Sequence, residues 1–169
     1  MAAEDNIEPA VAPDPTQGRF GIQKVYIKDL SFETPHSPQI FQEEWKPSVN
    51  LDLSSTASPV MENIYEVVLS VTVTVSFEDK TVYLAEVEQA GIFQIQDLPK
   101  DVLARVLATV CPNILFPFAR EVVADLAMRG GFPQLLIAPM NFEALYAQHQ
   151  QQVAAEAQAK SGAGGDRKH

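Results

Sequence analysis

Hydrophobic and polar residues alternate in four stretches of the chain, which is the pattern of strands that bury one face. The stretches are residues 22–33, 49–53, 65–77 and 81–95. The third is the clearest, because seven apolar or aromatic side chains from Tyr65 to Phe77 alternate with mostly polar ones. Glu78, Asp79 and Lys80 then form a turn into the fourth stretch, so we expect a hairpin within an antiparallel sheet.

After the fourth stretch the apolar residues recur every three or four positions, which indicates helices. A first helix is predicted over residues 101–110 and ends before Pro112, because proline lacks the amide donor and clashes with the preceding turn. A longer helix, capped by Asn113, runs to Gly130. Its apolar stripe consists of Phe118, Ala119, Val122, Val123, Leu126 and Ala127. A last helix is predicted over residues 141–152. Strands followed by helices predict the α+β class.

The two ends of the chain differ from its middle. Residues 1–18 contain four acidic side chains, three prolines and no basic residue, which predicts a disordered acidic arm. Residues 153–169 are rich in Ala, Gln and Gly and are expected to form a flexible tail. Residues 19–152 remain as a single folded domain, in agreement with a total length of 169 residues.

A proline-rich segment, residues 34–47, separates the first two strands. It also contains Ile40, Phe41 and Trp45, which are side chains that rarely stay in water. In one interpretation these three side chains plug the side of the core. In the other they line a groove for a ligand or a partner chain.

The net charge and the apolar runs of the chain disfavour several classes of protein. There are 12 Lys and Arg against 22 Asp and Glu, giving a net charge of −10, so nucleic-acid binding is disfavoured because an anionic surface repels phosphates. The N-terminus lacks the basic start and the apolar stretch of a secretory signal. No run approaches the roughly 18 apolar residues that span a bilayer. We therefore expect a cytoplasmic protein without direct membrane insertion.

Candidate groups for catalysis or metal binding are few. The single cysteine, Cys111, excludes an internal disulfide, and its position before Pro112 with no histidine nearby favours a buried structural thiol. The three histidines, His36, His149 and His169, are isolated from one another and do not supply a Cys/His metal cluster. The chain also lacks the glycine-rich phosphate loop of ATPases. We therefore expect no enzymatic activity and no cofactor.

Six blocks of the sequence resemble the SecB family of protein-export chaperones. They are residues 27–33 (IKDLSFE), 65–69 (YEVVL), 90–93 (AGIF), 111–121 (CPNILFPFARE), 130–134 (GGFPQ) and 138–142 (APMNF). Their order and spacing hold over residues 23–152. The resemblance implies a SecB-like fold, with a four-stranded antiparallel sheet followed by a long helix and a C-terminal helix, assembled as a dimer of dimers. Phe118, Val122 and Leu126 would then belong to an assembly surface or to the core.

The resemblance also implies a function and two binding surfaces. SecB chaperones hold newly made precursor proteins unfolded without hydrolysing ATP, and pass them to SecA, the motor of the translocase. Their client groove lies between the loop after the first strand and the last helix, which here corresponds to Ile40, Phe41, Trp45, Phe142 and Leu145. SecA docks on a negatively charged sheet surface, for which the matching residues are Asp29, Glu33, Leu84 and Glu86.

Two alternatives stay open at this point. One is a SecB-like chaperone dedicated to a toxin–antitoxin pair, which would bind one client tightly. The other is a small-ligand-binding or enzymatic α+β domain with a closed pocket beneath the proline-rich segment. That pocket would need polar or titratable groups around Trp45, and only His36 is near in the sequence. The acidic strand residues, taken alone, are also explained by solubility.

Overall fold

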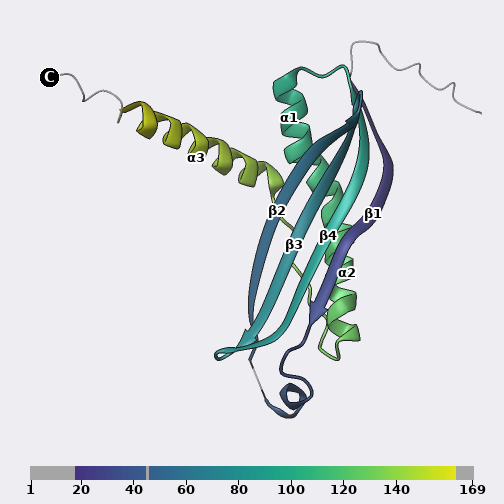
Figure 1. The fold of residues 1–169 in the computed structure, drawn as a ribbon, viewed down its shortest axis with the longest axis vertical. Coiled ribbons are helices and arrows are strands. Elements are labelled where there is room, and N and C mark those ends of the chain that lie inside the picture. The colour runs from purple at the N-terminus through teal and green to yellow at the C-terminus, as the bar shows by residue number, and fades with distance from the viewer. Residues whose placement is uncertain (1–17, 45, 163–169) are drawn as a thin grey trace, which may run out of the picture.

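The computed structural model describes residues 18–44 and 46–162, and strands precede helices in it as predicted (Figure 1). The elements are β1 (Arg19–Glu33), the short 3-10 helix η1 (Gln39–Gln42), β2 (Ser48–Met61), β3 (Ile64–Phe77), β4 (Lys80–Gln96), α1 (Lys100–Ala108), α2 (Val110–Arg129) and α3 (Phe142–Gly162). The expected α+β fold, with its antiparallel sheet, long helix and C-terminal helix, is confirmed.

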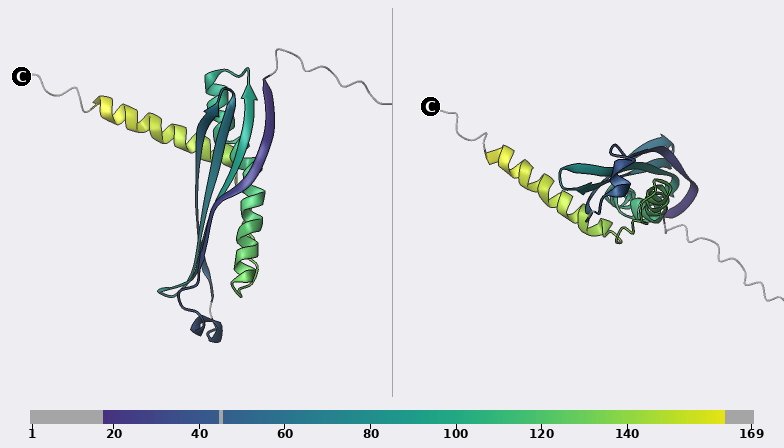
Figure 2. Two further views of the ribbon diagram at one scale, coloured as in Figure 1. Left: turned by 45° about the vertical axis from the view of Figure 1, so that its right-hand side comes forward. Right: turned by 90° about the horizontal axis from the view of Figure 1, so that it is seen from below.

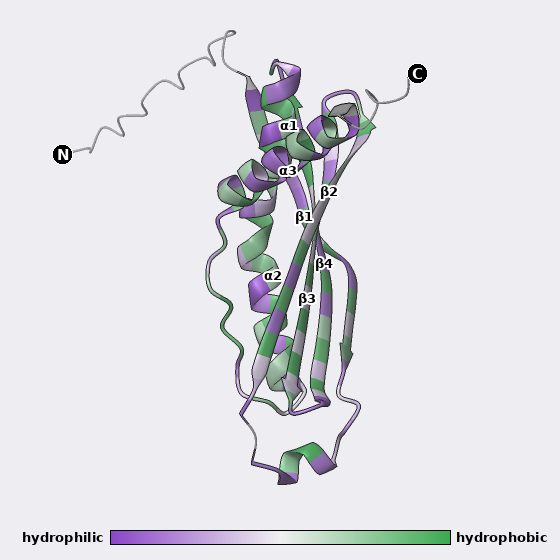
Figure 3. Ribbon diagram, turned by 90° about the vertical axis from the view of Figure 1, so that its left-hand side faces the viewer, coloured by the Kyte–Doolittle hydropathy of each residue, from purple (hydrophilic) through white to green (hydrophobic). Residues whose placement is uncertain are grey.

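The four strands form one antiparallel sheet in the order β1-β4-β3-β2, so β1 and β2 are its edges. Alternate residues of β3 are buried, and the hydropathy colours alternate along the strands in the same way (Figure 3). α1 and α2 cover one face of the sheet, which we call the helix face, while no described element covers the opposite face, which we call the open face (Figure 2). The alternation thus separates a core-forming face from an open face.

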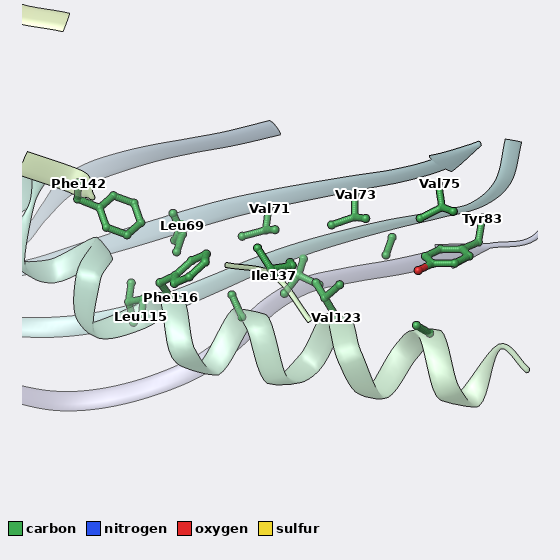
Figure 4. Packing of buried hydrophobic residues seen from close by; sticks show 14 of the residues in the cluster. Leu69, Val71, Val73, Val75, Tyr83, Leu115, Phe116, Val123, Ile137 and Phe142 are labelled. Carbon is green, nitrogen blue, oxygen red and sulfur yellow. The ribbon is translucent and has the colours of Figure 1, made fainter. Parts of the chain in front are cut away.

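The core lies between the sheet and α2. Leu69, Val71 and Val73 of β3 point toward Leu115 and Val123 of α2 (Figure 4). The row of α2 that is buried against the sheet has a four-residue spacing and consists of Cys111, Leu115, Ala119, Val123 and Ala127. Small alanine side chains in that row let the helix approach the strands closely. Of the rest of the predicted stripe, Val122 and Leu126 are partly buried and Phe118 is 45% exposed.

β2 is much longer than its sequence pattern predicts. It spans 14 residues, Ser48–Met61, whereas alternation was visible only over residues 49–53. Residues 54–58 are small or polar and are all exposed, although they stay paired with β3 along the edge of the sheet. Continuous pairing with β3, rather than the local pattern, makes this segment a strand.

The helix boundaries also differ from the sequence prediction. Pro112 does not end a helix but lies in the first turn of α2, where no intrahelical amide donor is needed, and Asn113 is helical instead of a cap. Asn141 does cap α3, since its Oδ1 accepts a hydrogen bond from the Ala144 amide at 3.0 Å. α3 then continues to Gly162, because Ala and Gln are strong helix formers. Residues 1–17 and 163–169 of the predicted arm and tail lie outside the described residues.

The helical span Lys100–Arg129 contains a window that is long and apolar enough, by length and composition, to cross a membrane, with a mean hydropathy of 1.7. Core helices of soluble proteins meet the same criterion, so this window does not contradict the prediction of no membrane insertion. In the structure this span packs on the sheet through α2, and 33% of the window is buried. It is therefore a core helix with a large apolar surface left uncovered in one chain.

Candidate functional site

Acidic residues gather on the open face of the sheet where β1 and β4 pair. The antiparallel register sets three pairs side by side on this face, namely Glu33 with Leu84, Ser31 with Glu86, and Asp29 with Glu88. Directly opposed side chains in such pairs have Cβ atoms about 4.5–5.5 Å apart. We call Asp29, Glu33, Leu84, Glu86 and Glu88 the acidic patch.

The acidic patch brings together all four residues that the family resemblance implied for SecA docking. Ser31 Oγ donates a hydrogen bond to Glu86 Oε2 at 3.2 Å, which orients this carboxylate. Glu88 belongs to the patch because it pairs with Asp29. Asp52 of β2 lies on the same face: it pairs with Thr72 of β3, which in turn pairs with Glu86 of β4. Sequence reasoning missed Asp52 because strand order and register are not visible in a local pattern.

A second polar cluster on the open face ties β1 to β3 across β4. Lys28 Nζ lies 2.6 Å from Glu66 Oε1, and the Tyr26 hydroxyl donates a hydrogen bond to Glu66 Oε2. The Lys28 ammonium, followed by the Tyr26 hydroxyl, lowers the pKa of Glu66. The same hydrogen bond to the Glu66 carboxylate raises the pKa of Tyr26 to about 12. When Glu66 and Lys28 are both charged, the cluster therefore stabilises the attachment of edge strand β1 to the sheet.

We expect Lys28→Met to reduce the free energy of unfolding by about 0.2–1 kcal/mol at pH 7, the range for a largely exposed ion pair. Because the pKa of Glu66 is lowered in the folded protein, its stabilisation is present above the ordinary value of 4.5 and is lost as the pH falls through the folded value. The cost should therefore shrink as the pH is lowered from 7 to 3, because protonation of Glu66 removes its attraction to Lys28. Urea unfolding at fixed protein concentration measures it, with Lys24→Met as the control. An equal cost at both pH values would contradict the ion-pair account.

Two apolar pockets open along β2 on the helix face. The larger, which we call the α3 pocket, has a volume of about 610 Å³ and is lined by Leu53, Ser54, Ser55, Leu69, Ala104, Ala108, Phe142, Leu145, Tyr146, His149 and Gln150. The smaller, the β2 pocket, has a volume of about 260 Å³ and is lined by Val49, Leu51, Val73, Leu135, Leu136, Ile137 and Ala138. Leu51 and Leu53 are successive residues on one face of β2, so the two pockets adjoin along this strand. Neither lining contains an acidic residue, a lysine or an arginine.

The predicted groove residues of the last helix both belong to the α3 pocket. Leu145 is 40% exposed and offers its side chain to the pocket. Phe142 is buried, and its ring packs edge-on against Phe116 with centroids 5.8 Å apart (Figure 4). Phe142 therefore anchors α3 as well as lining the pocket. Trp45 lies outside the described residues, and its place in the groove stays a prediction.

The other two predicted groove residues lie at the far end of the sheet, on η1. Ile40 is completely buried in the core, so in this structure it plugs the core and is not on a surface that a client reaches. The segment is held there by the ion pair between Lys80 and Glu43 at 3.0 Å and by the His36 ring, whose Nδ1 lies 3.0 Å from the Thr81 carbonyl oxygen. Phe41, in contrast, is half exposed. The core-plug interpretation thus holds for Ile40 and not for Phe41.

Phe41 ends a row of aromatic rings that sequence reasoning missed. Its ring lies 5.2 Å from Phe132, Phe132 lies 4.8 Å from Tyr83, and Tyr83 stacks on Phe32 at 5.5 Å. Burial raises the pKa of the Tyr83 hydroxyl. Gly131 makes room for the row, because it has φ of +87° and a Cβ there would lie 3.2 Å from the Phe41 ring. The Gly130-Gly131 pair in the sequence signalled the helix end, but not this close approach.

The different positions of Ile40 and Phe41 predict different costs of truncation. Ile40→Ala should reduce the free energy of unfolding by about 2–5 kcal/mol, because it leaves a cavity in the core. Phe41→Ala removes a half-exposed ring and should cost clearly less. Chemical denaturation of both variants measures the difference. A smaller loss for Ile40→Ala than for Phe41→Ala would contradict the core-plug assignment.

Comparison with known proteins gives one consistent family. Residues 13–153 match the family model described as preprotein translocase subunit SecB. A relative from Nitrosococcus oceani, named protein-export protein SecB, is 56% identical over 152 residues, covering 89% of this chain and 93% of the relative. A relative of the same name from Methylobacillus flagellatus is 52% identical over 147 residues, covering 87% and 94%.

A solved structure shares the fold. It is the Mycobacterium tuberculosis SecB-like chaperone in complex with a ChAD peptide from the HigA1 antitoxin, with a TM-score of 0.57 and 21% identity. The similarity covers 73% of this chain and 91% of that chain.

Proposed function

Because this chain belongs to the SecB family of protein-export chaperones, we propose that it is an ATP-independent holdase, which keeps precursor proteins unfolded in the cytoplasm and delivers them to SecA. The observation that carries the proposal is the uncharged apolar surface formed by the α3 pocket and the β2 pocket along a free edge strand. We call the two pockets together the client groove.

The client groove suits an extended polypeptide. β2 is an edge, so one row of its backbone amides and carbonyls has no strand partner among the described residues. A client segment that pairs with this row would present alternate side chains, about 6.6–6.8 Å apart, to the two pockets. Backbone pairing is independent of sequence and the pockets accept any apolar side chain. This combination explains broad selection for unfolded chains, because folded proteins do not expose such segments.

High affinity for a client requires that several such grooves bind the same client chain. Burying one apolar client side chain contributes roughly 1.5–3 kcal/mol, whereas association and ordering cost about 4–15 kcal/mol. A single pocket is therefore too weak. Several grooves on one oligomer would hold several segments of the same client and raise the effective concentration of each.

Exposed apolar surfaces support the proposed homotetramer. On edge strand β1, the side chains Phe20, Ile22, Ile27 and Leu30 are each more than 40% exposed. On α2, Val110, Phe118 and Met128 are also exposed. Edge-to-edge pairing through β1 would remove a free edge, and α2 packing between two sheets would cover the second surface. A dimer of dimers accounts for both.

The acidic patch is the proposed docking surface for SecA. It occupies the open face of the sheet, whereas the client groove lies on the helix face at the β2 edge. Motor and client could therefore bind at the same time without competing for residues. A basic domain of SecA would be attracted to the carboxylates, which favours fast docking that weakens with salt.

The alternatives receive less support. The antitoxin-bound neighbour has 21% identity to this chain and shows the fold alone, whereas relatives above 50% identity are named protein-export proteins. A small-ligand site needs converging polar groups, but the α3 pocket and the β2 pocket lack acidic, lysine or arginine side chains. We therefore retain export as the function.

The proposal is tested by refolding a slowly folding precursor protein from denaturant in the presence of the purified chaperone without ATP. We expect refolding to stop while the chaperone is in excess, and the held precursor to be recovered with SecA. Refolding at the unassisted rate would refute the holdase activity. Holding without transfer to SecA would refute the delivery step.

A further inference from the structure

α3 extends well past the α3 pocket and projects away from the sheet (Figures 1 and 2). We propose that its pocket-facing side continues the client groove outward as far as Val153, so that an unfolded client chain leaving the α3 pocket lies along the helix. This inference rests on the proposed holdase function and adds a contact surface beyond the body of the domain.

Three contacts fix the base of α3 and therefore the direction of its faces. Asn141 caps the helix through the Ala144 amide. Arg105 of α1 donates two hydrogen bonds to Glu143 Oε2, from Nε at 3.1 Å and from Nη2 at 2.9 Å. Phe142 is buried against Phe116 on α2. Contacts to two different helices prevent α3 from turning freely about its axis.

Helical geometry then places Val153 on the pocket side. The pocket-lining residues of α3 are Phe142, Leu145, Tyr146, His149 and Gln150, which is the spacing of one helix face. At about 100° per residue, Val153 falls near the middle of that face, roughly 6 Å along the axis beyond His149. Val153 is 49% exposed.

The composition of α3 beyond the α3 pocket is asymmetric. Val153 is the one large apolar side chain between Ala147 and Lys160, and it falls on the pocket side. The opposite side carries only Ala and Gln, as at Gln151 and Ala155. A solvent-exposed helix made for solubility alone has no need of a valine at this place.

The surface suits an extended client better than a second helix. Glu156 and Lys160 follow Val153 on the same side, so the apolar face ends after one further turn. A helix–helix contact needs apolar residues repeated over several turns. A client chain already held in the α3 pocket needs only one more weak contact to extend its path, and Val153 is continuous with that pocket.

Photocrosslinking tests the inference directly. A benzophenone amino acid replaces Val153 or, as the matched control, Ala155 on the opposite side, and the probe is reduced, carboxymethylated α-lactalbumin, which stays unfolded. We expect crosslinks to the probe from position 153 that clearly exceed those from position 155. Equal yields from the two positions, or crosslinks from position 153 to a second copy of the chaperone instead of the probe, would overturn the inference.

Affinity provides the second test. Val153→Glu should weaken binding of the same probe about 3- to 10-fold, as expected for the loss of one partly buried apolar contact, while Ala155→Glu adds the same charge and leaves binding unchanged. Val153→Leu should retain binding, and circular dichroism checks that α3 stays helical in each variant. Unchanged binding of Val153→Glu refutes this inference alone. No binding of the probe by the unsubstituted chaperone refutes the holdase function.

Discussion

Reversing charge in the acidic patch, with Asp29→Lys and Glu86→Lys combined, is expected to reduce the affinity for SecA about 100-fold or more. The substitutions replace two carboxylates with ammonium groups that face a basic partner, and like charges across an interface cost several kcal/mol. A loss of about 2.8 kcal/mol already corresponds to 100-fold. Titration of SecA against the labelled chaperone at low and physiological salt measures the effect.

The control is a double variant with the same change in net charge at positions outside the acidic patch. Glu62→Lys and Asp79→Lys lie in the turns at the two ends of the β2–β3–β4 meander and are exposed. They should weaken SecA binding only slightly, through the general field of the protein. Client holding should be unchanged in both double variants. Equal loss of SecA binding in the two would show that net charge, not this patch, attracts the motor.

Placing charges in the client groove is the second change with a large expected effect. Leu53→Asp and Leu145→Asp put one carboxylate on each side of the α3 pocket, and binding of an unfolded client should fall about 100-fold. Each substitution removes roughly 1.5–3 kcal/mol of apolar burial and adds a charge that must be desolvated. Suppression of precursor refolding at a fixed chaperone concentration measures the loss.

A matched pair of aspartates separates the groove from general acidity. Asn50→Asp lies on the open face of β2, and Ala155→Asp lies on the side of α3 away from the pocket. This pair should hold clients normally. The earlier candidates are tested alongside, since Trp45→Ala with Phe142→Ala should also reduce holding. Because Phe142 is buried against Phe116, its truncation needs a parallel stability measurement. Full holding by Leu53→Asp with Leu145→Asp would remove the pocket from the proposed function.

Local sequence patterns predicted the parts of the fold that are determined by residues close together in the sequence. β3 and β4 alternate clearly and are joined by a short turn, so their hairpin could be read from the chain. Residues 54–58 of β2 could not, because an exposed stretch of strand needs no alternation. The position of Pro112 was misread, since proline breaks a helix interior but is tolerated in a first turn.

The sequence predicted residues of the candidate surfaces only where alternation along a strand was enough to assign a side chain to one face of the sheet. Asp29, Glu33 and Glu86 could be placed on a strand face, but their proximity depends on the β1–β4 register, which is a long-range property. Ile40 was predicted to line the groove and is buried in this structure, because sequence does not distinguish a side chain that fills a core from one that lines its surface. Leu136 and Ile137 were missed because they belong to an irregular segment, whose position depends on the packing of α2 and β2.

Light scattering of the purified protein, with and without reduced, carboxymethylated α-lactalbumin, distinguishes a client-binding tetramer from a monomer that ignores unfolded proteins. We expect a particle of about 74 kDa, four times the 18.6 kDa chain, whose mass rises by that of the bound client without ATP. An 18.6 kDa particle whose mass is unaffected by the unfolded protein would contradict it.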